Sequence, residues 1–120
     1  MSLESTEKLL VEWGKWARRG QIIPRYMSPA TAMYLHNVEQ DREPDPQITE
    51  DEAMMIDRAI SRLRIRDAGV HEILFDHYLC RKSIRFIMRT RQMPERLVNE
   101  VINRGIGWID AVLDTATQQV

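Results

Sequence analysis

Residues 81–110 read RKSIRFIMRTRQMPERLVNEVINRGIGWID, and this stretch decides the fold that we expect for the whole chain. Ser83 is a suitable N-cap for a short helix, because its hydroxyl can accept a hydrogen bond from a backbone N–H of the first turn. Apolar residues then recur at helical spacing at Ile84, Ile87 and Met88. Residues 91–93 are expected to form a turn, and Pro94 suits the first position of a second helix, where its missing N–H costs nothing. The stretch therefore predicts a short helix, a turn and a longer helix.

The second helix would carry one apolar face and one polar face. At about 100° per residue, the apolar face contains Val98, Val101, Ile102, Gly105, Trp108, Ile109 and Val112. We expect this face, with Trp108, to lie in the core. The opposite face carries Arg96, Asn99, Glu100 and Asn103. The row from Arg96 to Asn103 spans about 10 Å at the helical rise, which is long enough to meet several base edges in a DNA major groove.

The net charge of −1 conceals two blocks of opposite sign. Between residues 39 and 57, eight acids stand against one arginine; between residues 81 and 104, seven bases stand against two acids. Charge runs are usually solvated faces, but the basic block coincides with the helix–turn–helix pattern, which favours nucleic-acid binding. The residues that we predict to bind DNA are Arg81, Lys82, Arg85, Arg89, Arg91, Arg96, Asn99, Asn103 and Arg104.

These residues divide by role. The bases at the start of the block, which we expect to hold phosphates, are Arg81, Lys82, Arg85 and Arg89. Asn99 and Asn103 can each pair with adenine, and Arg96 with guanine, through two hydrogen bonds. The acidic residues 39–46 would be repelled by DNA, so we expect them to face away from it or toward a basic protein partner.

The N-terminal part is expected to contain one helix and a long irregular segment. Residues 4–18 form the helix, with Leu9, Leu10, Trp13 and Trp16 on one side. The two tryptophans are core residues in our preferred interpretation; if exposed, they would mark a partner surface. Gly20 ends the helix, four prolines break up residues 21–47, and Ser28 can cap a short helix through residue 35. Residues 37–47 are polar and are expected to form an exposed loop of low stability.

The remaining pattern is also helical. Thr49 and Glu52 form a capping box that starts a helix to about Arg66. Its apolar stripe consists of Ala53, Ile56, Ala59, Ile60 and Leu63. Residues 70–79 form a further helix that would bury Val70, Ile73, Leu74 and Tyr78. We therefore expect an all-α chain with one domain over residues 1–120: an N-terminal helix and loop segment at 1–48, and a helical core at 49–115 with the helix–turn–helix at 83–110.

Composition excludes several function classes. No apolar run approaches the ~20 residues that cross a bilayer, and the start lacks the pattern of a signal peptide. A single cysteine fits a reducing cytoplasm and excludes zinc modules built on several cysteines. His71, His77 and Cys80 form the one cluster worth testing as a metal site, but further ligands are missing nearby. With no phosphate loop and no nucleophile motif, we expect neither an enzyme nor a bound cofactor or metal.

Four segments in this order carry a resemblance to a known family. They are LLVEWGKWAR, ITEDEAMMIDRAISRLR, HEILFDHYLC and VINRGIGWIDAVL. The chain resembles the Q-type antitermination proteins of lambdoid phages, in their shorter, zinc-free group. The resemblance covers nearly the whole chain and rests on the order and spacing of these segments. One departure lies in the turn, where the family often has a glycine and this chain has Gln92 and its neighbours.

The resemblance implies a fold and a set of partners. It implies a helix–turn–helix similar to region 4 of sigma factors, with the DNA-reading helix at residues 94–107. It also implies binding to a DNA element at a phage late promoter, loading onto paused host RNA polymerase that carries a sigma factor, and readthrough of terminators. A homodimer on DNA is left open, and the protein would act in the cytoplasm of the bacterial host without membrane contact.

Two other functions fit the residues. A conventional dimeric helix–turn–helix regulator would recognise a palindromic site, whereas an antiterminator's site would overlap a promoter and a pause element. A non-DNA-binding helical assembly protein would use the helix pair to pack against a partner and would show no salt-dependent DNA binding.

Overall fold

The computed structural model describes residues 3–19 and 43–118, and every regular element in these ranges is helical. In chain order the elements are α1 (Leu3–Arg18), α3 (Glu50–Arg66), α4 (Ala68–Leu74), a π-helical turn η2 (Phe75–Leu79), α5 (Ile84–Arg91) and α6 (Glu95–Gln118). The predicted all-α class is thus confirmed. Gly20, the short helix expected at 28–35, and Glu39, Asp41 and Arg42 lie outside the described residues.

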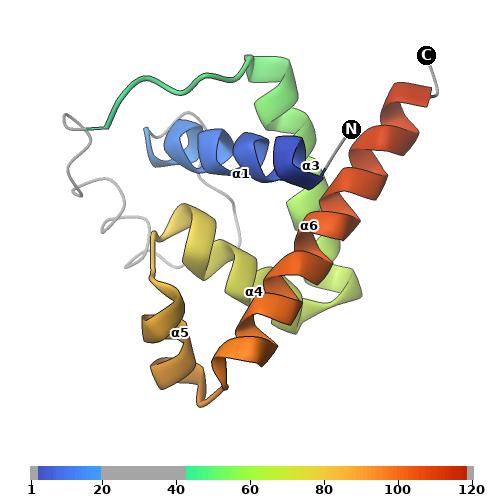
Figure 1. The fold of residues 1–120 in the computed structure, drawn as a ribbon. Helices are drawn as coiled ribbons and strands as arrows, with labels where there is room; N and C mark the ends of the chain where they lie inside the picture. The colour runs from blue at the N-terminus through green and yellow to red at the C-terminus, as the bar shows by residue number, and fades with distance from the viewer. Residues whose placement is uncertain (1–2, 20–42, 119–120) are drawn as a thin grey trace.

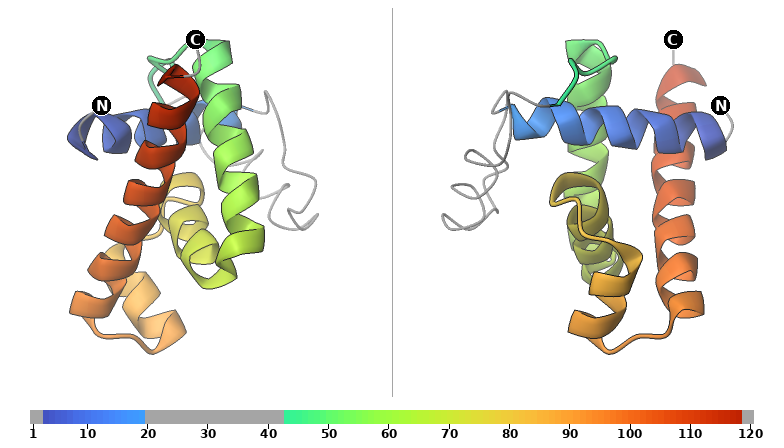
Figure 2. Two further views of the ribbon diagram at one scale, coloured as in Figure 1. Left: turned by 90° about the vertical axis from the view of Figure 1, so that its right-hand side faces the viewer. Right: turned by 60° about the vertical axis from the view of Figure 1, so that its left-hand side comes forward.

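Helices α3 and α6 run side by side in opposite directions, and α1 crosses both near one end of the molecule (Figures 1 and 2). Below α1, α4 packs between them, and α5 lies farther out, against η2 and the beginning of α6. The turn between α5 and α6 is the point of the molecule farthest from α1 (Figure 1). The helix–turn–helix therefore projects from the end opposite α1.

The tryptophans of α1 are core residues, as predicted. Trp13 is fully buried and Trp16 is nearly so, together with Leu10. Gly14 between them is required by close packing, because a Cβ there would collide with the backbone carbonyl oxygen of Tyr78 in η2. The W-G-x-W segment therefore places two large side chains in the core and lets α1 approach the backbone of η2 closely.

The start of α3 follows the prediction closely. The Thr49 hydroxyl accepts a hydrogen bond from the Glu52 N–H at 3.1 Å, and the Glu52 carboxylate accepts one from the Thr49 N–H at 3.1 Å. The helix ends at Arg66, and its buried residues are the predicted Ala53, Ile56, Ala59, Ile60 and Leu63. A capping box and an apolar stripe, both local features, were sufficient to define this element.

The helix expected at 70–79 differs in form. It begins at Ala68, capped by Asp67, and its last part widens into η2. The Cys80 N–H reaches back five residues to the Phe75 carbonyl at 3.0 Å. The carbonyls of Tyr78 and Leu79 at the end of η2 accept hydrogen bonds from the Arg18 guanidinium, at 2.8 and 3.0 Å. Apolar periodicity cannot distinguish this turn from an ordinary α-helix, although the four predicted buried residues are buried.

The core face of α6 is rotated slightly from the predicted one. Val98, Val101, Ile102, Gly105 and Ile109 are buried as expected, but Trp108 and Val112 are half-buried, and Ile106 and Leu113 are buried instead. Trp108 lies at the edge of the stripe, where its indole N–H donates to the Ala59 carbonyl at 3.3 Å. The prediction that Trp108 lies inside the core is therefore wrong, because the indole packs at the margin between α3 and α6.

Candidate nucleic-acid interface

The α5–α6 pair has the predicted order of cap, short helix, turn and long helix. The Ser83 hydroxyl accepts a hydrogen bond from the Phe86 N–H at 3.0 Å and so caps α5. Ile87 is fully buried and holds α5 on the core, with Ile84 and Met88 packed at its margin. The pair is thus a supported unit that projects from the rest of the molecule.

Two residues define the turn. Gln92 adopts the left-handed conformation, with φ 54° and ψ 51°, which glycine reaches without a steric cost. Pro94 precedes α6 by one residue, where the prediction placed it at the first helical position. Its carbonyl accepts the first hydrogen bond of the helix, from the Val98 N–H at 3.1 Å. Its missing N–H is again harmless, because no donor is needed there.

The predicted polar stripe of α6 faces solvent. Arg96, Asn99 and Asn103 are exposed, and Arg96 pairs with Glu100 at 2.9 Å. This ion pair is 81% and 50% exposed, so it contributes little stability and its arginine can change partner at small cost. Within the described residues, neither Asn99 nor Asn103 uses its amide in a hydrogen bond. The stripe is therefore available for an external ligand.

The bases of α5 fall into two groups. Arg85 and Arg89 are exposed and make no ion pair with any other residue that the structure describes. Arg91 instead contacts Asp76 and Glu72, each at 2.9 Å, and its side chain is only 33% exposed. Arg91 thus ties the end of α5 to η2 and α4. The first two arginines are free to meet phosphates, whereas Arg91 serves as an anchor.

The other predicted bases lie around this pair. Arg81 joins η2 to α5 with φ 58°, and its guanidinium lies 3.6 Å from the Glu43 carboxylate. The Lys82 ammonium sits 4.8 Å from the centre of the exposed Phe86 ring. Arg104 is exposed beside a shallow depression that Met93 and Val101 also line. The three bases therefore have different surroundings, and Arg81 is shared with an internal acid, Glu43.

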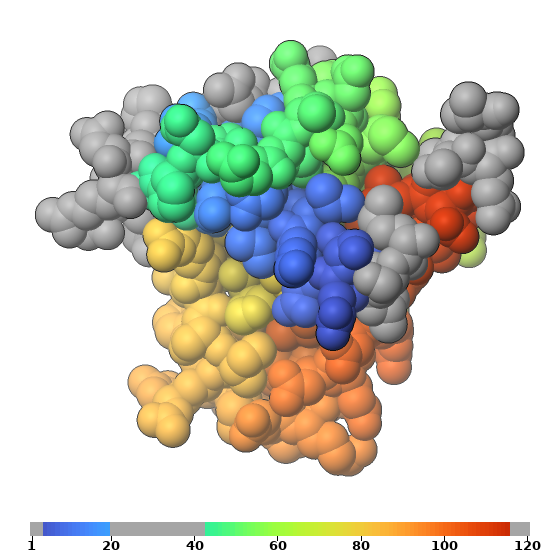
Figure 3. Space-filling model, turned by 45° about the horizontal axis from the view of Figure 1, so that its top comes forward, coloured from blue at the N-terminus to red at the C-terminus, as the bar shows by residue number. Residues whose placement is uncertain are grey.

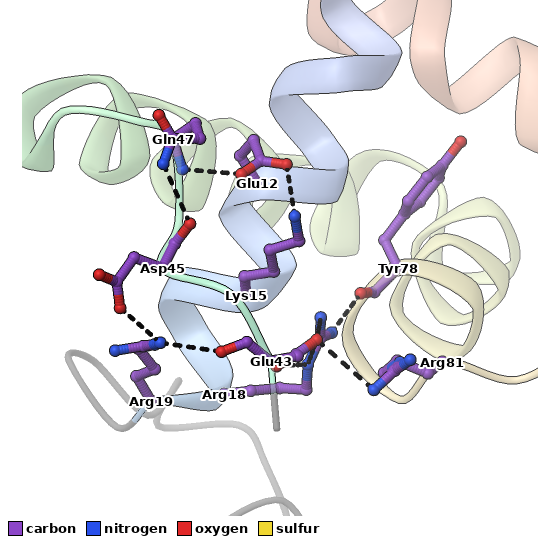
Figure 4. Close-up of polar contacts among 9 residues, drawn as sticks. All are labelled: Glu12, Lys15, Arg18, Arg19, Glu43, Asp45, Gln47, Tyr78 and Arg81. Atoms are coloured by element: carbon purple, nitrogen blue, oxygen red, sulfur yellow. Dashed lines mark hydrogen bonds and ion pairs between the residues drawn. The ribbon is translucent and has the colours of Figure 1, made fainter. Parts of the chain in front are cut away.

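Residues 43–49 lie against α1 on the surface (Figure 3), and two arginines of α1 hold the beginning of this segment (Figure 4). Arg18 is 5% exposed and donates to the Glu43 carboxylate with Nε at 3.0 Å and also with Nη2. Desolvation raises the pKa of Glu43, but the hydrogen bonds and charge of Arg18 outweigh it, so the pKa lies below its ordinary value. These contacts fix Glu43 between α1 and the entrance to α5.

Further contacts hold the same segment, residues 43–49, against α1. Arg19 pairs with Asp45 at 2.8 Å, and the Gln47 N–H donates to the Glu12 carboxylate at 2.7 Å (Figure 4). The expectation that the acidic segment is an exposed loop, available to a basic partner, is therefore wrong at Glu43, whose side chain is 11% exposed. Asp45 is exposed but already paired. The cause is that the basic C-terminal end of α1 supplies the counter-charges.

Sequence reasoning missed these anchoring residues. Arg18 stands 25 positions from Glu43 and 60 from Tyr78, so no local pattern connects them. The sequence offered only a weak indication of these contacts: two arginines stand at the end of the first helix, and a group of acids follows about 20 residues later. Glu72 and Asp76, which hold Arg91, were likewise too distant to be recognised.

The candidate metal cluster does not assemble within the described residues, where no group of three suitable ligands is found. The His77 ring Nδ1 lies 2.9 Å from the Lys82 carbonyl oxygen, so it supports the chain before α5. Burial lowers the pKa of His71 and raises that of the Cys80 thiol, which keeps both groups uncharged near neutral pH. In the part of the chain that the structure describes, no helix is long and apolar enough to cross a membrane.

The fold and site together define an all-helical protein that presents a basic helix–turn–helix at one end. A family model described as phage antitermination protein Q matches residues 4–120. The chain therefore belongs to the phage antitermination protein Q family. Two relatives, the antitermination protein Q of Escherichia phage 933W and that of Enterobacteria phage VT2-Sa, are each 22% identical over 92% of this chain and 76% of their own length.

Solved structures share the fold. The transcription antitermination factor Q21, as its selenomethionine derivative, matches 97% of this chain and 89% of its own, with a TM-score of 0.72 and 24% identity. Q21 in complex with Q21-binding-element DNA matches with a TM-score of 0.70 and 24% identity, over 97% of this chain and 91% of its own. The predicted resemblance to Q-type antiterminators is thus confirmed at the level of family and fold.

Proposed function

We propose that this antitermination factor binds a DNA element near a phage late promoter through α5 and α6, and then modifies paused host RNA polymerase so that it reads through terminators. The observation that carries the proposal is the exposed stripe of Arg96, Asn99 and Asn103 on α6, together with exposed Arg85 and Arg89 on α5. These two helices form the projecting end of the molecule (Figure 1). It would act in the cytoplasm of the bacterial host, where polymerase and DNA are present.

Both helices would contact DNA, but in different ways. The first half of α6 would enter the major groove, where Asn99 and Asn103 read adenine and Arg96 reads guanine. Arg85 and Arg89 on α5 would hold phosphates and fix the register, in the manner of region 4 of sigma factors. A protein of the same fold, Q21, has been solved with its own binding-element DNA, which supports DNA binding by this fold.

Anchoring residues would position the reading helix without contacting bases. Arg91 ties α5 to Asp76 and Glu72, and Arg81 links the entrance of α5 to Glu43. A DNA phosphate near Arg81 would compete with Glu43, because a guanidinium 54% exposed can turn toward solvent. The protein would act by binding alone, with no catalytic step of its own.

In vitro transcription through a terminator, from the cognate late promoter, tests the proposal. The wild-type chain should raise readthrough, and the Asn99→Ala, Asn103→Ala double variant should lose its preference for the element by about 1–3 kcal/mol per contact. Its weak nonspecific binding and its circular dichroism should stay unchanged, because both side chains are exposed. Lys8→Ala, on the exposed side of α1, is the matched control.

Two outcomes would contradict the assignment. A double variant that binds the element normally yet fails in readthrough would mean that the stripe faces polymerase. A palindromic site bound by two symmetric copies, without readthrough, would favour a conventional dimeric regulator. If the double variant is defective only in loading onto polymerase, a higher protein concentration should partly restore its readthrough.

A further inference from the structure

The proposed DNA contacts leave unused a groove between α3 and α6. We name it the α3–α6 groove: Met55, Arg58, Ala59 and Arg62 line it on one side, and Trp108 and Val112 on the other. Its volume is about 450 Å³. In the left view of Figure 2, both helices face the viewer and no other helix lies in front of them. The groove is thus an open surface beside the core.

The groove combines an apolar floor with a basic rim. Ala59 and Val112 form part of the floor, and Arg58 and Arg62 are exposed above it. Within the described residues, these two arginines make no ion pair. Exposed charges beside an apolar floor are typical of a docking surface for a segment of opposite charge.

The same face extends along α3 by another turn. Helical periodicity places Ile65 in line with Arg58 and Arg62, and Ile65 is 84% exposed, the largest value among large hydrophobic side chains of the described residues. From Met55 to Ile65 the face spans about 15 Å at the helical rise. Its length therefore fits a partner helix of about three turns.

A peptide fits this groove better than a nucleic acid. Stacking a base requires an open aromatic face, but the Arg66 guanidinium lies 5.8 Å from the centre of the Trp108 ring. The indole edge is also engaged, through its hydrogen bond to the Ala59 carbonyl at 3.3 Å. The small apolar floor suits aliphatic side chains, and the rim suits carboxylates.

We propose that the α3–α6 groove docks an acidic amphipathic helix of the RNA polymerase complex. Apolar residues of that helix would fill the floor, while its carboxylates would pair with Arg58 and Arg62. This inference rests on the proposed function and names the polymerase-facing surface of the same protein. DNA recognition and polymerase binding would then use different parts of α6, since the groove is lined by residues 108–115 and the exposed stripe lies at residues 96–103.

Photocrosslinking with the full chain tests the occupant. A benzophenone amino acid replaces Ala111, an exposed groove residue, in complexes with polymerase holoenzyme, element DNA and labelled transcript. We expect a crosslink to an acidic segment of a polymerase subunit, and none to that segment from the same probe at Lys8. A crosslink only to DNA or RNA, only to a second copy, or to nothing while readthrough persists, would overturn the proposal.

Charge reversal gives an independent measurement. Arg62→Glu should raise the protein concentration for half-maximal readthrough about tenfold, because attraction at the rim becomes repulsion. DNA affinity and the melting temperature should not change, and Lys8→Glu should leave all three quantities unchanged. Unaltered readthrough, or an equal loss of DNA affinity, would contradict the groove assignment alone. If the wild-type chain gave no readthrough, the proposed function itself would fail, and the groove's role with it.

Discussion

The two halves of α6 belong to one continuous helix, yet they pack against different helices. The second half packs against α1 and α3 and buries Ile109 and Leu113. The first half is supported by α4 and α5, and α5 contributes one fully buried side chain, Ile87. Apolar burial secures both halves, since Val98 in the first half is fully buried, and ion pairs such as that of Arg91 add to the support of the projecting end. Only the first half also carries the exposed stripe that we predict to read DNA, so the two halves differ in what they present to solvent.

The largest expected effect lies at the α1 end. Trp13→Ala should lower the free energy of unfolding by about 3–5 kcal/mol, because the side chain is fully buried and its removal leaves a cavity. Urea denaturation followed by circular dichroism measures this change. Val11→Ala, on the exposed side of the same helix, should change stability by less than about 0.5 kcal/mol. Equal effects of the two substitutions would contradict the core that we describe.

The ion pair that holds Glu43 against α1 should make the stability depend on pH. Glu43→Gln should destabilise the protein by about 1–2 kcal/mol at pH 7, because a charged hydrogen bond to buried Arg18 is lost. The folded-state pKa of Glu43 lies below its ordinary value, so this contribution is present above the unfolded pKa and disappears as pH falls through the folded pKa. Urea midpoints of wild type and variant should therefore converge in acid. A difference that persists at the lowest accessible pH would mean that the charge is not responsible.

The contrast between these regions also explains what the sequence could predict. The capping box of α3 and the N-cap of α5 consist of neighbouring residues, so their chemistry is visible in a short stretch. Helical periodicity identified the exposed stripe of α6, because a stripe opposite an apolar face must meet solvent. The family resemblance supplied the function that periodicity alone left among three alternatives.

Other features depended on distant partners. The burial of Trp108 is decided by how α3 lies against α6, and a helical wheel gives the apolar face but not its margin. Arg91 was predicted to bind DNA because it stands in a basic block, yet Asp76 and Glu72 come to it only in the folded chain. Charge counts therefore predicted a basic surface but could not show which of its arginines are held by internal acids.

A comparison of two nearby arginines sharpens that distinction. Arg89→Ala should weaken binding to all DNA sequences and lower the salt slope of the binding constant by roughly one, while stability is unchanged. Arg91→Ala should lower the free energy of unfolding by about 1 kcal/mol, because it removes two ion pairs that hold α5. DNA titrations at several salt concentrations, together with urea denaturation, separate the two effects. An unchanged slope for Arg89→Ala would mean that this arginine does not touch the backbone.

The smallest expected effect is a gain in stability at the turn. Gln92 holds φ at 54°, where a Cβ is unfavourable by about 1–2 kcal/mol, and part of this is offset because glycine has more freedom in the unfolded chain. Gln92→Gly should therefore stabilise the protein by about 0.5–1 kcal/mol. Gln92→Ala removes the same polar group but keeps the Cβ, so it should give no gain. DNA affinity should stay the same for both variants, since the turn only connects the helices. If glycine gave no more stability than alanine, the left-handed conformation of this residue would be contradicted.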